Sequence, residues 1–301
     1  MTEPYLGKIE SWLERIEPLE LRPTGAVPSY SKEEGIKAVV FDIYGTLIIS
    51  ASGDVMQSEY SADMYKDACI AAGIEITANE DEALIYMHDI YELMVKVHKE
   101  RSRKKGIPFP EVDIEKVWTD VLADADQIGL IKLNDTYDLR TFIFVFELKS
   151  NKVWPMPGLK EALEGIRNKG YKMGIVSNAQ FYTPVIMNYF LYHKIEGKPF
   201  LDKFDEGLSV FSYKLLKGKP DTAIYKALFL GMEEQGIKPE EILYVGNDML
   251  KDIWPANEVG FKTVFYAGDQ RAYRLREDHP QASLTKPDHI ITSLTQLLEI
   301  I

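Results

Sequence analysis

One apolar run constrains the fold of this chain more than any other segment. Residues 36–41 read Ile-Lys-Ala-Val-Val-Phe, a short stretch rich in β-branched side chains, and the run ends abruptly at Asp42, with Gly45 three positions later. Such a run predicts a strand that is buried on both faces. In open α/β sheets, ligands bind at the carboxyl ends of the strands. A carboxylate at this tip therefore marks a candidate functional site.

Further strands and helices alternate after residue 155. The predicted strands are short and apolar and lie at 171–176, 208–211, 242–245, 261–265 and, at an edge, 289–291. Pro157 and Gly158 open the first helix of this series, Gly170 ends it, and Ser293 is placed to cap the last helix. Strands that alternate with helices predict an α/β fold, a doubly wound and mostly parallel sheet with helices on both faces.

Four predicted helices interrupt this alternation after the first strand. Their apolar residues recur at helical spacing, over about 57–72, 80–104, 111–124 and 135–149. Another amphipathic helix is predicted near the N-terminus, followed by a proline-rich linker. The predicted organisation is an N-terminal helix and linker at 1–35, an α/β core formed by 36–50 and 151–301, and a helical insertion at 51–150.

Composition limits the classes of partner. The chain has 301 residues and a net charge of -12, which argues against nucleic acid, because phosphate backbones are bound by basic surfaces. A small anionic molecule held by a local positive site stays compatible with this charge. The single cysteine, Cys69, excludes a disulfide within the chain and indicates a reducing compartment. We expect a cytoplasmic protein with no membrane segment, since no apolar stretch approaches the roughly 20 residues that a membrane helix needs.

Polar side chains gather where the predicted strands end. Asp42 and Ser177 follow two strands, Lys219 opens a helix, and Asp248 and Asp252 follow a third strand. A carboxylate such as Asp42 can act as a nucleophile when its electrophile is neutralised and positioned. Lys219 supplies a positive charge, and the hydroxyl of Ser177 is a hydrogen-bond donor.

The two acids Asp248 and Asp252 are four residues apart at the start of a helix. This spacing puts them on one face, where they can hold or support a hard cation. Mg²⁺ suits such a site because it takes one or two carboxylates, keeps several waters and binds substrate phosphate. We therefore predict Mg²⁺ as the cofactor and a small anionic molecule as the substrate. Oligomeric state stays open.

The segment Asp42-Ile43-Tyr44-Gly45-Thr46 resembles the first motif of the haloacid dehalogenase superfamily, usually Asp-x-Asp-Gly-Thr. The other polar positions match the remaining three motifs in order. The resemblance implies a hydrolase whose helical insertion is a cap of the first type, closing over the site and selecting the substrate. The predicted catalytic residues are Asp42, Tyr44, Ser177 and Lys219. The predicted substrate contacts are Thr46, Ser177, Asn178 and Lys219.

The same resemblance implies a metal site. Its predicted ligands are Asp42, the main-chain carbonyl of Tyr44, Asp248 and Asp252, and Asp252 could instead support Lys219 or the metal's surroundings. The first acid of the fourth motif often falls at the position of Asn247. Asn247 and Asp248 are therefore both candidates for the group that faces the metal.

Tyr44 stands where phosphatases of this family have a second aspartate, the general acid for the leaving alcohol. The pKa of a tyrosine is about 10, far from the operating range of such an acid. Loss of general acid–base help slows a reaction by about 10²- to 10⁴-fold, so weak phosphatase activity is expected.

The form Asp-x-Tyr-Gly-Thr also resembles the 2-haloacid dehalogenases, in which the aspartate attacks carbon and no alcohol needs a proton. Those enzymes need no metal and hold the substrate carboxylate with an arginine soon after the first motif, whereas here no arginine occurs between Arg22 and Arg101. The acids of the fourth motif favour a Mg²⁺-dependent phosphatase that forms an aspartyl-phosphate. A dehalogenase and a non-catalytic relative that binds a ligand or partner stay as alternatives. We interpret the basic run 101–105 as a solvated helix end.

Overall fold

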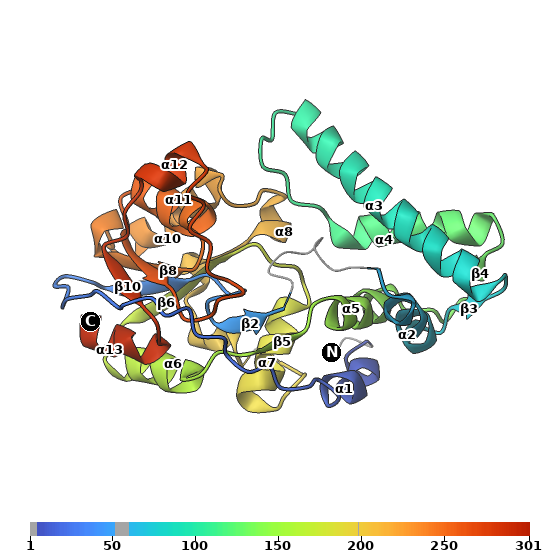
Figure 1. Ribbon diagram of the computed structural model, residues 1–301, viewed down its shortest axis with the longest axis horizontal. Helices are drawn as coiled ribbons and strands as arrows, with labels where there is room; N and C mark the ends of the chain where they lie inside the picture. The colour runs from blue at the N-terminus through green and yellow to red at the C-terminus, as the bar shows by residue number, and fades with distance from the viewer. Residues whose placement is uncertain (1–4, 52–59, 198) are drawn as a thin grey trace.

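The core of this computed structural model, which describes residues 5–51, 60–197 and 199–301, is a six-stranded parallel sheet (Figure 1). The strand order is β10-β9-β8-β1-β6-β7. The bounds of the strands are β1 Ala38–Phe41, β6 Lys172–Ser177, β7 Ser209–Phe211, β8 Ile242–Gly246, β9 Lys262–Tyr266 and β10 His289–Ile291. All pairings between neighbours are parallel, which confirms the predicted doubly wound fold.

Strand β1 is buried on both faces because its side chains alternate between two hydrophobic clusters. Val39 and Phe41 pack into the cluster of α6 Leu159–Asn168, α7 Thr183–Tyr192 and α13 Leu297–Ile300. Ala38 and Val40 pack into the cluster of α9 Thr222–Lys226, α10 Phe229–Glu234 and α11 Trp254–Glu258. Helices thus cover both faces of the sheet, and β1 lies between β6 and β8.

The remaining short elements of the core connect these layers. They are η1 Leu201–Lys203, η2 Glu206–Leu208, α8 Ser212–Leu215, η3 Pro239–Glu241, η4 Met249–Ile253, α12 Pro280–Leu284 and η5 Leu294–Gln296. The helix expected at Asp248 and Asp252 is present but divides into the π-helix η4 and the α-helix α11. Pro255 has no amide hydrogen to donate to Lys251 and its ring crowds that carbonyl. The hydroxyl of Tyr225 donates to the Lys251 carbonyl instead, at 2.7 Å.

The inserted helices form a cap whose long helix α3 extends away from the sheet (Figure 1). Its elements are α2 Ala62–Ala72, β3 Glu75–Ile76, α3 Glu80–Lys104, α4 Ile114–Gln127, β4 Ile131–Lys132 and α5 Leu139–Ser150. Part of the predicted helix at 57–72 falls outside the described residues. Asn79, Asp113 and Asp138 accept hydrogen bonds from amides of the first turns of α3, α4 and α5. These caps explain why the three helices begin where they do.

Two short antiparallel strands lie where the chain leaves and re-enters the core. They are β2 Ile48–Ser50 and β5 Val153–Pro155. The hydroxyl of Ser50 also donates to the side chain of Asn151, at 3.0 Å. The sequence analysis missed this pair, because three-residue strands carry too little periodicity to be recognised. The boundaries of the cap at 51 and 150 stay a prediction.

The N-terminal arm, residues 5–31, contacts both the cap and the core. Its helix α1, Leu6–Leu13, lies where an amphipathic helix is predicted near the N-terminus and packs against α5. Tyr5 meets the ring of Phe181 edge to face with centroids 6.1 Å apart, and the guanidinium of Arg140 from α5 lies 5.0 Å from the same ring. Farther along, the arm forms β-bridges at Pro23 with Asp269 and at Ser29 with Ile290. None of the described helices combines the length and apolarity required to cross a membrane.

Gly174 in β6 allows the backbone at Leu208 to pack closely against the sheet. A Cβ atom at this position in β6 would lie 2.0 Å from the carbonyl oxygen of Leu208. We predict that Gly174→Ala lowers the free energy of unfolding by about 1–3 kcal/mol, the usual cost of overpacking. Urea unfolding measures this difference. The control is Gly7→Ala in α1, where a Cβ meets open space. An equal stability of the two variants would contradict this close packing.

Candidate active site

Three neighbouring strands bring the predicted site residues to one edge of the sheet. Asp42 follows β1, Ser177 ends β6, and Asn247 and Asp248 follow β8. In the register of the sheet, Phe41 lies opposite both Ile175 and Val245. The ends of these strands are therefore level, and their polar groups meet at the carboxyl edge.

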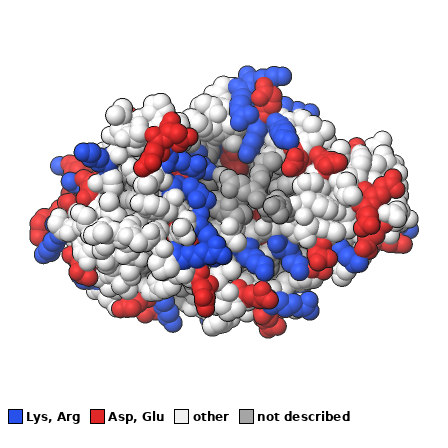
Figure 2. Space-filling model, in the orientation of Figure 1, with Lys and Arg blue, Asp and Glu red and all other residues white. Residues whose placement is uncertain are grey.

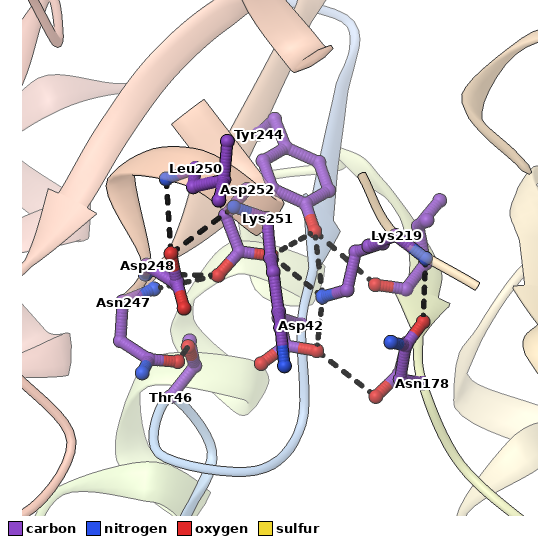
Figure 3. Close-up of polar contacts among 12 residues, drawn as sticks. Asp42, Thr46, Asn178, Lys219, Tyr244, Asn247, Asp248, Leu250, Lys251 and Asp252 are labelled. Atoms are coloured by element: carbon purple, nitrogen blue, oxygen red, sulfur yellow. Dashed lines mark hydrogen bonds and ion pairs between the residues drawn. The ribbon is translucent and has the colours of Figure 1, made fainter. Parts of the chain in front are cut away.

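Asp42 is buried, and one of its oxygens is fixed by two donors (Figure 3). The ammonium of Lys219 donates to Oδ1 at 2.6 Å, and the hydroxyl of Ser177 donates to the same oxygen at 2.9 Å. Among the described residues, Oδ2 has no hydrogen-bond donor. Asp42 also lines a cavity of about 360 Å³. The structure thus leaves one carboxylate oxygen available in a cavity while the other is held in place.

Lys219 lies between two carboxylates and is itself buried. Its ammonium donates to Asp252 Oδ1 at 2.6 Å as well as to Asp42. Burial acts to lower the pKa of Lys219, but Asp252 and Asp42 outweigh it, so the pKa is raised and the ammonium stays charged. Asn178 accepts a hydrogen bond from the Lys219 amide at 2.8 Å and lines the cavity, as a substrate contact requires.

Asp252 supports this arrangement rather than facing the cavity with a free oxygen. Oδ1 accepts from Lys219 and, at 3.0 Å, from the hydroxyl of Tyr244. Oδ2 accepts from the amides of Asn247 and Asp248 at 3.1 and 3.0 Å. Burial raises the pKa of Asp252, and the Lys219 ammonium opposes that rise. All four acceptor directions are used, so the geometry does not support the prediction that Asp252 ligates the metal. It fits the alternative, support for Lys219.

Asn247 and Asp248 play different parts in the loop after β8. The side chain of Asn247 accepts from Thr46 Oγ1 at 3.0 Å and donates to the carbonyl of Ala272 at 2.7 Å. Asp248 accepts from two amides of η4 and pairs with Arg276 at 2.7 Å. Both residues line the cavity, but Asp248 alone brings a charge. This favours Asp248 as the group that would face a metal.

Thr46 and Ser177 are buried and use their hydroxyls within the protein. Neither is among the described residues that line the cavity. Their hydrogen bonds to Asn247 and Asp42 give both a positioning role. Direct contact of either side chain with a substrate stays a prediction.

Tyr44 lines the cavity, but its hydroxyl is a poor acid. It is hydrogen bonded to Thr183 Oγ1, at 2.9 Å. Burial raises the pKa of Tyr44 well above its usual value, and the carboxylates of Glu147 and Asp42 raise it further. The structure therefore strengthens the expectation that Tyr44 does not replace the missing aspartate.

Basic residues that the sequence analysis missed line the same cavity. Arg274 and Arg276 come from the loop after β9, and Lys99 and Arg103 come from α3. Arg103 belongs to the run interpreted as a solvated helix end; its side chain is exposed in the last turn of α3, and it also lines the cavity. Although no arginine occurs between Arg22 and Arg101, distant segments supply arginines to the cavity. Arg274 and Arg276 lie within four residues of Ala272, but no periodicity signals that this loop returns to the strand ends.

Glu147 is a buried carboxyl one side chain away from the cavity. Its carboxyl is hydrogen bonded to Tyr182 and Asn151, which both line the cavity. Burial raises the pKa of Glu147 to about 7, and the two hydrogen bonds oppose this rise. Glu147 lies in the apolar helix α5, and nothing in the sequence indicated that its carboxyl would be buried beside the site.

We predict that Glu147→Gln changes how stability depends on pH. A folded-state pKa above the unfolded value means that Glu147 favours folding most below about pH 4.3, and that this contribution is lost as the pH rises to about 7. From pH 5 to pH 8 the free energy of unfolding of Glu147→Gln should rise by about 2–3 kcal/mol relative to the wild type. Urea unfolding at both pH values measures this, with the exposed Glu164→Gln as control. Parallel profiles for Glu147→Gln and wild type would contradict it.

Comparison with known proteins agrees with this geometry. The chain is 25% identical over 238 residues to a glyceraldehyde 3-phosphate phosphatase of Pyrococcus furiosus, covering 73% of this chain and 90% of that protein. It is 27% identical over 276 residues to a phosphoglycolate phosphatase of Escherichia coli, covering 89% and 93%. The structure of a 2-haloacid dehalogenase from Pseudomonas syringae, 20% identical, covers 88% of this chain and 97% of its own, with a TM-score of 0.54. That last likeness shows the fold alone.

A model of one family covers the cap and most of the core. The model for haloacid dehalogenase-like hydrolases matches residues 36–260, which span all four motifs from Asp42 to Asp252. The phosphatase relatives agree with hydrolase activity. The protein therefore belongs to the haloacid dehalogenase-like hydrolases.

Proposed function

We propose that the protein is a Mg²⁺-dependent phosphatase that acts on a small phosphorylated metabolite through an aspartyl-phosphate on Asp42. The main support is that one oxygen of the Asp42 carboxylate is held by hydrogen bonds and the other is not. Lys219 and Ser177 hold Oδ1, while Oδ2 has no donor among the described residues. A buried carboxylate fixed in this way in a cavity is suited to attack an electrophile.

The residues present fit a hard cation. Within the described residues, no cluster of three or more His, Cys, Asp or Glu side chains could hold a metal. Mg²⁺ does not need one, because it takes one or two carboxylates and fills its shell with carbonyl, water and phosphate oxygens. The proposed ligands are the Asp42 carboxylate, the Tyr44 carbonyl oxygen and Asp248. The carbonyl of Tyr44 accepts no hydrogen bond from the described residues. When bound, Mg²⁺ would neutralise the phosphoryl oxygens.

The proposed reaction has two steps at Asp42. Its carboxylate oxygen forms a bond to phosphorus, and the bond from phosphorus to the leaving oxygen breaks. Water then attacks the phosphorus of the aspartyl-phosphate, which releases phosphate and restores the carboxylate. Lys219 keeps its positive charge beside Asp42 throughout, so the negative charge that gathers there is offset. The leaving oxygen takes its proton from water, because Tyr44 is not acidic enough to supply it.

The cap contributes residues to the proposed site. Lys99 and Arg103 of α3 line the cavity together with Asp42 and Lys219, so the cap forms one wall of the site. We infer that the helical insertion at 51–150 gates access and selects the substrate. A cavity of about 360 Å³ lies near the lower end of the usual range for ligand sites. The phosphatases named above act on short phosphorylated compounds, and we propose the same substrate size here.

The first test compares two reactions in one preparation. We predict phosphate release from p-nitrophenyl phosphate that requires Mg²⁺ and stops with EDTA. Asp42→Asn should lower kcat by at least about 10³-fold, because removing a nucleophile costs this much or more. The exposed Asp202→Asn serves as the control. Chelator-insensitive halide release from 2-chloropropionate would establish a dehalogenase instead, and the absence of both reactions would favour a non-catalytic relative.

The second test varies the leaving group. Without a general acid, kcat/KM for an aryl phosphate should exceed that for an alkyl phosphate by about 10²- to 10⁴-fold. Tyr44→Asp should narrow this difference by speeding the alkyl substrate, since it restores a carboxyl at that position. The matched variant Tyr44→Phe removes only the hydroxyl. A selective loss of the alkyl activity in Tyr44→Phe would show that Tyr44 is the acid after all.

A further inference from the structure

The cavity that contains Asp42 has a surplus of positive side chains in a chain of net charge -12. Among the described residues that line it, the acidic ones are Asp42, Glu111, Asp248 and Asp252. The basic ones are Lys99, Arg103, Lys219, Lys251, Arg274 and Arg276. Lys219 is paired with two carboxylates and Arg276 with one. Arg274, Lys99 and Arg103 contribute to the surplus, which favours a substrate with more than one anionic group.

Arg274 is held rigidly beside the catalytic loop. Its amide donates to the Asn247 carbonyl at 3.3 Å, and its carbonyl accepts from the Met249 amide at 2.9 Å. The side chain of Asn247 also holds the carbonyl of Ala272. The Arg274 side chain is half-buried and lines the cavity, yet its guanidinium has no ion pair or hydrogen bond with any residue in the described ranges. A fixed backbone thus presents an unpaired guanidinium to the substrate space.

Lys99 and Arg103 line the part of the cavity that the cap contributes. They are four residues apart in α3, so they lie on one face of the helix. Lys99 is half-buried and has no ion pair within the described part of the chain, and Arg103 approaches only Glu100, at 3.8 Å. Figure 2 shows basic side chains on both sides of the middle of this face, over the core and over the end of α3. Positive charge therefore faces the cavity from both parts of the protein.

We propose that Arg274, assisted by Lys99 and Arg103, binds a carboxylate at the end of the substrate remote from the phosphoryl group. This inference rests on the proposed phosphatase function, and it makes the substrate class a short phosphomonoester of a hydroxy acid. A guanidinium fits a carboxylate because two parallel N–H groups can meet its two oxygens. The cavity of about 360 Å³ leaves room for only a short chain between the two anionic groups.

The experiment uses two substrates that differ at one carbon. 3-Phosphoglycerate and sn-glycerol 3-phosphate have the same three-carbon skeleton, with a carboxylate in the first and a hydroxymethyl group in the second. We expect kcat/KM of the wild type to favour 3-phosphoglycerate by about tenfold or more, the effect of one charge-assisted hydrogen bond. Arg274→Gln should reduce this preference by about 10- to 100-fold, mainly by raising KM for 3-phosphoglycerate. Lys99→Gln should act in the same direction.

The matched control is Arg101→Gln, an exposed arginine on α3 that is outside the lining of the cavity. It should leave both activities unchanged. An equal fall for both substrates in Arg274→Gln, or no fall, overturns the inference. If the wild type releases phosphate from neither compound, the proposed function fails, and calorimetric binding of the same pair to the wild type and Arg274→Gln decides the subsite. Tighter binding of 3-phosphoglycerate that Arg274→Gln removes supports it, and equal binding overturns it.

Discussion

The ion triad of Asp42, Lys219 and Asp252 is the interaction on which the site depends. Each member is buried, and each comes from a different part of the chain: the end of β1, the loop before α9 and the π-helix η4. Breaking a buried pair by removing one partner costs about 3–5 kcal/mol, because it leaves an uncompensated charge. The triad therefore links the connections after β7 and β8 to Asp42, the proposed nucleophile. The proposed chemistry and the stability of the fold would depend on the same three side chains.

The neighbours of the triad explain why the fold tolerates it. Tyr244 donates to Asp252 and lies on β8, so the sheet itself supplies a hydrogen bond to the buried acid. The amides of Asn247 and Asp248 saturate the other oxygen. A buried charge is stable when its hydrogen bonds are complete, and these contacts complete them. The loop after β8 is thus fixed by the acid that follows it.

Much of this architecture could be predicted from the sequence. The strand ending at Asp42 and the alternation after residue 155 were predicted because buried parallel strands are continuous apolar runs and helices repeat every 3.6 residues. The same pattern predicted that Asp42, Ser177 and Asp248 lie at strand ends and that Lys219 lies at a helix start. The outcome for Asp252 differed, since its saturation by two backbone amides depends on the shape of a turn. The π-helix was not predicted because it depends on Pro255 and on the hydrogen bond of Tyr225 to Lys251, and the β2–β5 pair was not predicted because three-residue strands carry too little periodicity.

The arginines of the cavity show a second limit. Arg274 reaches the site only because backbone hydrogen bonds fold its loop back onto Asn247 and Met249, which are about 25 residues earlier. Local secondary-structure propensity does not predict that a loop folds back in this way. Arg103 looked like part of a charged helix end, and only the direction of α3 relative to the sheet brings it to the cavity. Helix existence was readable from the pattern, whereas helix orientation was not.

The N-terminal arm contacts both the cap and the core, which bears on the gating proposed for the cap. Tyr5 rests on Phe181 of the core, while α1 packs on α5 of the cap, so the arm spans the boundary between them. If α5 moves away from the core together with α1, the rings of Tyr5 and Phe181 must separate. If α1 stays in place, its contact with α5 must break. Either route exposes apolar surface at about 25 cal/mol per Å². In the gating motion proposed for the cap, the arm would therefore favour the closed form, and substrate entry would compete with a contact made by residues that precede the first motif by more than twenty positions.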